Sequence, residues 1–158
     1  MEHKPDQSAR RGRGRPKLNE NYIPEYPADF IPFYRNLSFI EREKVVRTRL
    51  TKKHLVCIKE ALSIDYDTLA DLLGVTDRVL HLRKDNEPFS RLISDKIASL
   101  LELYCYGLDV FNDPKQLKGW LSSPSESLNN RRPFDLIKTH PGLLKVRDLM
   151  HRMRLGQY

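Results

Sequence analysis

The amino-acid sequence predicts an all-α protein that begins with a disordered basic arm. From Ser38 onward the apolar residues recur at helical spacing, and no useful length of chain alternates apolar and polar residues as a strand does. Residues 1–20 contain almost no apolar side chain, so burial cannot offset the entropy cost of ordering them. The 158 residues suffice for one core or two small modules, but not for most large α/β enzyme folds.

The charge balance favours a polyanionic partner. The chain has 28 Lys and Arg against 21 Asp and Glu, which gives a net charge of +7 and an isoelectric point near 9.5. This balance is typical of proteins that bind nucleic acid and of some that bind anionic membranes. No apolar run approaches the roughly 18 residues of a membrane helix, and no apolar segment follows the charged N-terminus. We therefore expect a cytoplasmic protein with no membrane partner.

The chemistry-bearing residues predict no enzyme, metal site or cofactor. Cys57 and Cys105 match neither a metal-ligand pair nor a disulfide framework, and their apolar surroundings predict buried, inert thiols. The five histidines lack zinc-ligand spacing. No Gly-rich phosphate loop, nucleophile elbow or plausible carboxylate pair assembles an acid, a base and a nucleophile.

Residues 21–36 combine three prolines with five aromatic residues. The prolines disfavour a regular helix, while the aromatic side chains are costly to leave in water. We therefore expect an extended strap across a folded surface, which belongs to this chain, to a second copy or to another protein. The prolines are Pro24, Pro27 and Pro32, and the aromatic residues are Tyr22, Tyr26, Phe30, Phe33 and Tyr34.

The helices of the middle region follow in order. Ser38 and Glu41 have the spacing of a capping box, which predicts that the first helix begins there. Apolar stripes then mark a helix through residues 55–62, a short helix through 69–73 and a long helix through 90–111, which Pro114 closes. The stripe residues are Leu55, Ile58, Leu62, Leu69, Leu72, Leu73, Ile93, Ile97, Leu100, Leu101, Tyr104, Leu108 and Phe111.

The last third predicts a small helical module. A short helix around Leu117–Leu121 precedes a polar turn, and Pro133 can occupy the first position of the next helix. Gly142 is expected in a tight turn before the final helix, and Trp120 is expected to anchor the core. The final helix carries Val146, Leu149, Met150 and Met153 on one face.

Residues 67–84 have the pattern of a helix-turn-helix. Ala70 lies four residues before Gly74, which can adopt the left-handed conformation that ends a helix. Val75 is expected to plug the core and Thr76 to cap the second helix. Val79 and Leu82 are expected to hold that helix on the body, which leaves an outer face for the major groove. That face consists of Arg78, His81 and Lys84, and an ordinary helical hairpin with a Gly turn remains the alternative.

The basic arm contains a second DNA-binding pattern, GRGRPK at residues 12–17. Arg13 and Arg15 can lie along a narrow A·T-rich minor groove, because the glycine between them keeps the backbone close to its floor. The alternative is a solvated basic tail that only adds affinity for phosphates.

The order of features from Leu55 to the C-terminus resembles the Xre/MbcA/ParS-type antitoxins, whose partner toxins carry a RES domain. The helix-turn-helix residues that match are Ala70, Gly74, Val75, Thr76, Arg78 and Arg83. The more specific match is C-terminal and comprises Trp120, Leu121, Pro124, Leu128, residues 132–137, Thr139, Gly142, Val146, Leu149 and residues 152–158. Asn129 and Asn130 replace the paired glycines usual in the family, and asparagine tolerates the same left-handed backbone.

The resemblance implies a function as well as a fold. The chain would bind and neutralise a cognate RES-domain toxin, an enzyme that degrades NAD⁺, by covering its active site with the C-terminal segment. It would also bind operator DNA and repress its own operon, with the Xre-like domains paired in a homodimer. The residues expected to contact the toxin are Arg152, Arg154, Gly156, Gln157 and Tyr158.

Three regions follow from this interpretation. Residues 1–36 are the basic arm and strap, residues 37–111 the Xre-like helix-turn-helix domain, and residues 112–158 the toxin-binding domain. Two other functions stay open. One is a stand-alone helix-turn-helix regulator whose C-terminal domain only dimerises, and the other is an architectural A·T-binding protein that uses the arm.

Overall fold

The computed structural model describes residues 27–48 and 50–157, and all regular elements within these ranges are helices. Two isolated bridges, Thr51 to Pro88 and Ser125 to Arg131, are the extended pairings among these residues. The all-α prediction is confirmed, whereas the basic arm with Arg13 and Arg15 lies outside the described residues. The helices are α1 (Pro27–Asn36), α2 (Phe39–Arg47), α3 (Lys52–Leu62), α4 (Tyr66–Leu73), α5 (Asp77–Leu82), α6 (Arg91–Phe111), α7 (Pro114–Ser122), the 3₁₀ helix η1 (Glu126–Leu128), α8 (Pro133–Leu136) and α9 (His140–Arg154).

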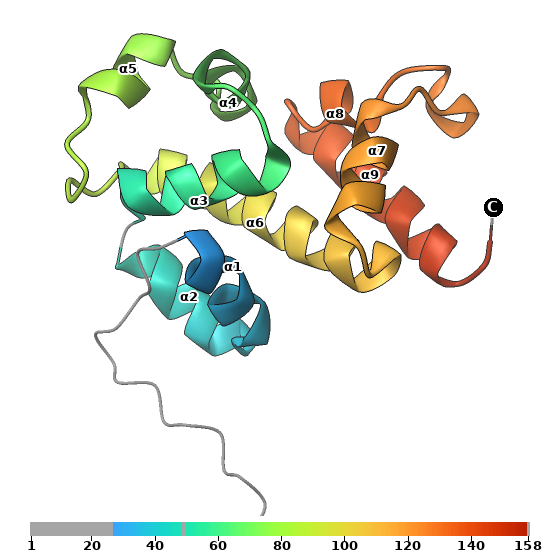
Figure 1. The fold of residues 1–158 in the computed structure, drawn as a ribbon, viewed down its shortest axis with the longest axis horizontal. Helices are drawn as coiled ribbons and strands as arrows, with labels where there is room; N and C mark the ends of the chain where they lie inside the picture. The colour runs from blue at the N-terminus through green and yellow to red at the C-terminus, as the bar shows by residue number, and fades with distance from the viewer. Residues whose placement is uncertain (1–26, 49, 158) are drawn as a thin grey trace, which may run out of the picture.

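Helix α6 is the central element, and six other helices contact it, whereas α5 packs on α4 and α8 packs on α7 and α9 (Figure 1). Its 21 residues begin at Ser90, whose hydroxyl accepts a hydrogen bond from the backbone N–H of Ile93, and end at Asn112 in the left-handed conformation. Helices α1 to α4 contact α6 on one side of the molecule, and α7 and α9 contact it on the opposite side. One continuous helix therefore joins the N-terminal helices to the C-terminal module.

Residues 27–36 form helix α1, so the predicted extended strap is wrong for this segment. Pro27 occupies the first helical position, where a missing N–H costs nothing, and Pro32 removes one hydrogen bond inside the helix. Burial of Phe30, Ile31 and Tyr34 against α3 and α6 outweighs that loss. The aromatic residues of α1 thus cover a surface of this chain, as one of the three alternatives proposed.

Polar contacts also fix the first two helices on α6. The Tyr34 hydroxyl donates to Glu102 at 3.0 Å, and Arg42 of α2 pairs with the other oxygen of Glu102 at 2.7 Å. Arg35 binds Asp109 at 2.5 Å, about two helical turns beyond Glu102 along α6. Burial, followed by the Glu102 carboxylate, raises the pKa of Tyr34 well above its usual value. Helix α2 itself begins at the predicted capping box, in which Ser38 and Glu41 exchange hydrogen bonds.

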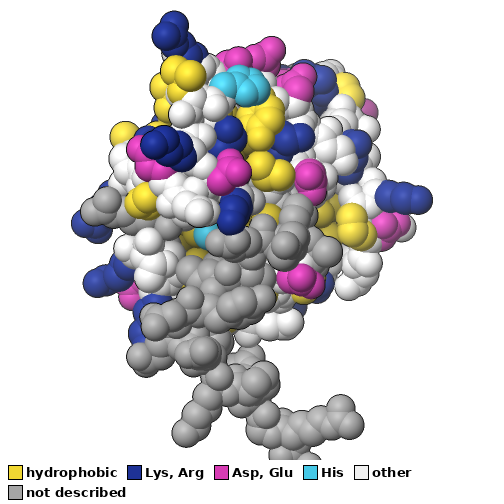
Figure 2. Space-filling view, turned by 60° about the vertical axis from the view of Figure 1, so that its left-hand side comes forward, with side chains coloured by type: hydrophobic (Ala, Val, Ile, Leu, Met, Phe, Trp, Pro, Cys, Tyr) yellow, Lys and Arg dark blue, Asp and Glu magenta, His cyan; other side chains and the backbone are white. Residues whose placement is uncertain are grey.

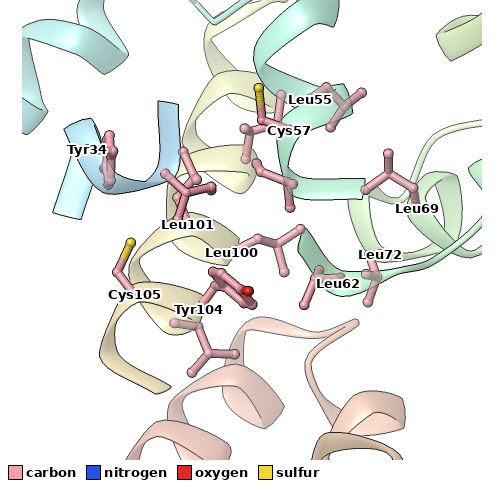
Figure 3. Close-up of a cluster of buried hydrophobic side chains, with 14 of the residues drawn as sticks. Tyr34, Leu55, Cys57, Leu62, Leu69, Leu72, Leu100, Leu101, Tyr104 and Cys105 are labelled. Carbon is pink, nitrogen blue, oxygen red and sulfur yellow. The ribbon is translucent and has the colours of Figure 1, made fainter. Parts of the chain in front are cut away.

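The core lies between α1, α3, α4 and α6 (Figure 3). The predicted stripes supply it, since Leu55, Leu69 and Leu101 are fully buried. Cys57 and Cys105 are buried free thiols, as predicted, and burial raises the pKa of each to about 11. Thiols with such pKa values carry almost no thiolate at neutral pH, so they are poor nucleophiles.

The C-terminal module consists of α7, η1, α8 and α9. Pro133 opens α8 as predicted, and Asn129 and Asn130 both adopt the left-handed conformation that the paired-asparagine turn requires. Trp120 packs against the core as a partly buried residue at its edge, with its ring centroid 5.4 Å from that of Phe111. Aliphatic residues occupy the centre instead, namely Leu117, Leu121, Ile137, Val146 and Met150.

Gly142 lies in the first turn of α9 and not in the expected interhelical turn. The cap is Thr139, whose hydroxyl oxygen accepts a hydrogen bond from the Gly142 N–H at 3.2 Å. A Cβ atom on Gly142 would stand 1.9 Å from the carbonyl oxygen of Leu136. Glycine is therefore required because the end of α8 packs directly against the backbone of α9.

Candidate functional site

Helices α4 and α5 have the local geometry predicted for the helix-turn-helix. Asp65 caps α4 by accepting a hydrogen bond from the Thr68 N–H, and Thr68 holds the pKa of Asp65 below its usual range. Gly74 ends α4 with φ +63°, in the left-handed conformation that the sequence predicted. Lys96 of α6 donates a hydrogen bond to the backbone carbonyl of Leu73 at 2.7 Å. This bond satisfies a carbonyl at the C-terminal end of α4, where the helix itself supplies no donor.

Helix α5 is rotated relative to the prediction. Val79 and Leu82 are 39% and 70% exposed, so they do not hold the helix on the body, whereas Leu80 is fully buried. Successive helical residues differ by about 100°, so burial of Leu80 turns the side of Val79 and Leu82 outward. In six residues only one side chain anchors the helix, and the apolar spacing alone could not identify which one.

The residues predicted to face DNA do not share one helical face. Arg78 and His81 lie exposed on α5, but Lys84 follows the end of the helix at Leu82. His81 lies 2.9 Å from Asp77, and its ring packs against Tyr66 with 4.8 Å between centroids. Thr76 occupies the N-cap position, yet its side chain makes no capping hydrogen bond.

The surface around α5 is electrostatically mixed. Figure 2 shows basic, acidic and hydrophobic side chains interspersed over the face that comes forward from the side of α5. Arg83 turns away from the predicted outer face, since it pairs with Glu87 at 2.7 Å and donates to the Pro88 carbonyl. The described part of this face therefore has exposed cations but no continuous basic patch.

A cleft of about 700 Å³ lies between α4 and the helices α7 and α8. Asp71 of α4 and Lys138 of the α8–α9 connection bridge it with a 2.5 Å ion pair. Within the cleft, Arg132 binds both carboxylate oxygens of Asp135 at 2.8 Å, and these hydrogen bonds lower the pKa of Asp135. Exposed ion pairs of this kind contribute little to stability, so the shared helix α6 chiefly sets how the two parts are placed.

Helix α9 ends in a Schellman motif, whose usual sequence signal is a glycine just after the helix, here Gly156. Gly156 has φ +70°, its N–H donates to the Met153 carbonyl at 3.0 Å, and the Gln157 N–H donates to the Arg152 carbonyl at 2.9 Å. These bonds fix the direction in which the chain leaves the helix.

The predicted toxin-contacting residues lie together at this end of α9. Arg154, Gly156 and Gln157 are exposed, and Arg152 is partly buried and pairs with Asp148 at 3.3 Å. Tyr158 lies outside the described residues. Gln157 follows the end of α9 and is exposed, and the chain leaves α9 there toward the C-terminus (Figure 1).

A second feature of α9 could not be foreseen from the sequence. The Tyr106 hydroxyl of α6 lies 2.9 Å from Nδ1 of His151, and the Arg147 guanidinium lies 5.8 Å from the centre of the Tyr106 ring. Arg147 and His151 are four residues apart, so their shared face is visible in the sequence. Tyr106 is more than forty residues away, and only the packing of α6 on α9 brings it there.

The described ranges contain no cluster of three or more His, Cys, Asp or Glu side chains able to hold a metal ion. Within the same ranges, no helix combines the length and apolar character needed to cross a bilayer.

Comparison with known proteins identifies the C-terminal module. Residues 107–156 match the family model described as "Antitoxin Xre/MbcA/ParS C-terminal toxin-binding domain". The chain is also 30% identical over 87 residues to a protein named "Antitoxin Xre" from Yersinia enterocolitica serotype O:8 / biotype 1B. That similarity covers 54% of this chain and 59% of the relative, so the chain spans little more than half of the relative's length. Residues 107–156 are therefore similar to the toxin-binding domain of the Xre/MbcA/ParS-type antitoxins.

Proposed function

We propose that this protein is an antitoxin that binds a cognate toxin through residues 107–157 and so neutralises it. The observation that carries the proposal is the match of residues 107–156 to a toxin-binding domain, on a module whose final helix ends at an exposed segment. The finer proposal is that the toxin is a RES-domain enzyme that degrades NAD⁺. In this proposal the C-terminal segment occludes the toxin's active site.

The geometry of the C-terminal end supports occlusion. The Schellman motif fixes the direction in which the chain leaves α9 at the exposed Gln157, and Gly156 leaves no side chain beside the backbone at that point. A segment with a fixed exit direction loses less entropy on binding than a flexible tail. Contact with the toxin is assigned to Arg152, Arg154, Gly156, Gln157 and Tyr158.

Co-expression with the adjoining toxin reading frame tests this proposal. The full chain is expected to restore growth, and a chain that ends at Met153 is expected to fail to do so while it keeps its thermal unfolding temperature. Removal of residues 154–158 leaves the packed side of α9 untouched, because Val146, Leu149 and Met150 are its buried residues. Growth restored equally by the truncated chain would show that the C-terminal segment does not occlude the toxin.

We also propose that the protein represses its own operon as a homodimer bound to operator DNA. The left-handed Gly74 turn and the exposed Arg78, His81 and Lys84 support this role, with Thr76 at the start of the second helix and Arg13 and Arg15 in an adjacent minor groove. A stand-alone regulator and an architectural A·T-binding protein are the competing functions.

The salt dependence of DNA binding tests the repressor role. Each Lys or Arg that neutralises a phosphate adds about 0.9 to the slope of log affinity against log salt concentration. The double variant Arg78→Ala, Lys84→Ala is therefore expected to reduce that slope by about 2 on the promoter fragment. A footprint spread evenly over A·T-rich DNA and unchanged by this double variant would favour the architectural function.

A further inference from the structure

The outward side of α9 carries a line of side chains that the core does not use. Leu144, Asp148, His151 and Leu155 lie within one narrow sector of the helix, opposite the buried residues. Leu144 and Leu155 are 49% and 56% exposed, and their separation of eleven positions corresponds to about 16 Å along the helix axis, with Leu155 at the C-cap. We call this surface, together with Arg147 and Tyr106, the α9 stripe.

The α9 stripe contains a hollow of about 320 Å³ lined by Tyr106, Leu144, Arg147, Asp148 and His151. The lining groups are held in place before any partner arrives. The Tyr106 hydroxyl lies 2.9 Å from His151 Nδ1, and the Arg147 guanidinium lies over the Tyr106 ring. Pre-organised tyrosine and arginine side chains around a hollow are typical of the residues that dominate binding energy in protein interfaces.

The charges of α9 define the chemistry of the partner. The helix has four Lys and Arg residues against one Asp, and that Asp148 is already paired with Arg152 at 3.3 Å. Within the hollow, Arg147 is therefore the uncompensated charge, and His151 adds a second polar group. The complementary surface is a carboxylate beside an apolar side chain.

We propose that the α9 stripe is a second anchor for the toxin, which presents an acidic and apolar segment to it. The proposal rests on the proposed antitoxin function and extends the contact from the C-terminal segment along the helix. The stripe ends at Leu155, directly before Gly156 and Gln157, so a protein that receives the C-terminal segment also faces the stripe. A second copy of this chain would bring two basic helices together, which costs free energy.

Charge reversal in full-length protein tests this proposal. The probe is the purified product of the adjoining toxin reading frame, and the measured quantity is its dissociation constant. Arg147→Glu is expected to weaken binding at least tenfold without lowering the thermal unfolding temperature, because Arg147 is exposed. Lys145→Glu makes the same charge change on the same helix, about 160° away from Arg147, and is expected to change binding less than threefold.

Tyr106→Phe supplies an independent variant, because it removes only the hydroxyl beside His151 and keeps the packed ring. It is expected to weaken toxin binding severalfold. The proposal is overturned if Arg147→Glu binds as tightly as the unaltered chain, or if Lys145→Glu loses as much. It is also overturned if Arg147→Glu changes the oligomeric state of the protein in solution but not its affinity for the toxin, because the stripe would then serve self-association. Failure of the unaltered chain to bind would instead contradict the antitoxin function itself.

Discussion

Gly142→Ala is expected to lower the free energy of unfolding of the C-terminal module by about 3 kcal/mol and to abolish neutralisation of the toxin. The added Cβ would stand 1.9 Å from the Leu136 carbonyl oxygen and 2.9 Å from the Thr139 hydroxyl. The Leu136 carbonyl belongs to the backbone and cannot move aside like a side chain. Helices α8 and α9 must therefore move apart, or the Thr139 cap of α9 must break. Thermal unfolding followed by circular dichroism measures the stability, and growth under co-expression measures neutralisation.

Gly119→Ala is the matched control. Gly119 is also helical, but a Cβ on it meets nothing within 4 Å. Alanine in a helix is favoured over glycine by up to about 1 kcal/mol, so this variant is expected to be neutral or slightly more stable. Equal stability of the two alanine variants would contradict the close packing of α8 against α9.

Phe30→Ala is expected to lower the free energy of unfolding by about 3–5 kcal/mol. The Phe30 ring is fully buried, 4.8 Å from the ring of His54 and 6.0 Å from that of Tyr34. Removing it leaves a cavity between α1, α3 and α6, which the helix backbones cannot close fully. Chemical denaturation of the full chain measures the change.

Phe39→Ala provides the comparison on the neighbouring helix. Phe39 is 81% exposed at the start of α2, so its removal is expected to change stability by no more than about 0.5 kcal/mol. If Phe30→Ala were as mild as Phe39→Ala, helix α1 would not be part of the folded core.

The helices with strong apolar periodicity were predictable from the sequence. The stripe from Ile93 to Phe111 marked α6, and Ser38 with Glu41 marked the start of α2, because local capping and burial on one face decide both elements. Helix α1 was not predictable, since its prolines oppose the helix locally. Only its packing on α3 and α6, which comes from distant sequence, stabilises it.

In the candidate site, the backbone conformation of the turns was predictable from the sequence, but the side of each helix that faces the core was not. Gly74, Asn129 and Asn130 take the left-handed conformation that their residue types favour. The orientation of α5 depends on which apolar residue reaches the core, and a six-residue helix offers Val79, Leu80 and Leu82 with little to separate them. The place of Tyr106 beside α9 was also not predictable, because only the packing of α6 on α9 brings it there.

Titration of the purified toxin with the full chain tests the central claim most directly, with NAD⁺ consumption as the measured rate. Under the proposed function, consumption falls to background near stoichiometric amounts of the chain, and added NAD⁺ opposes the inhibition, because the C-terminal segment and NAD⁺ are proposed to occupy the same pocket. A toxin that binds the chain but continues to consume NAD⁺ at its full rate would contradict it.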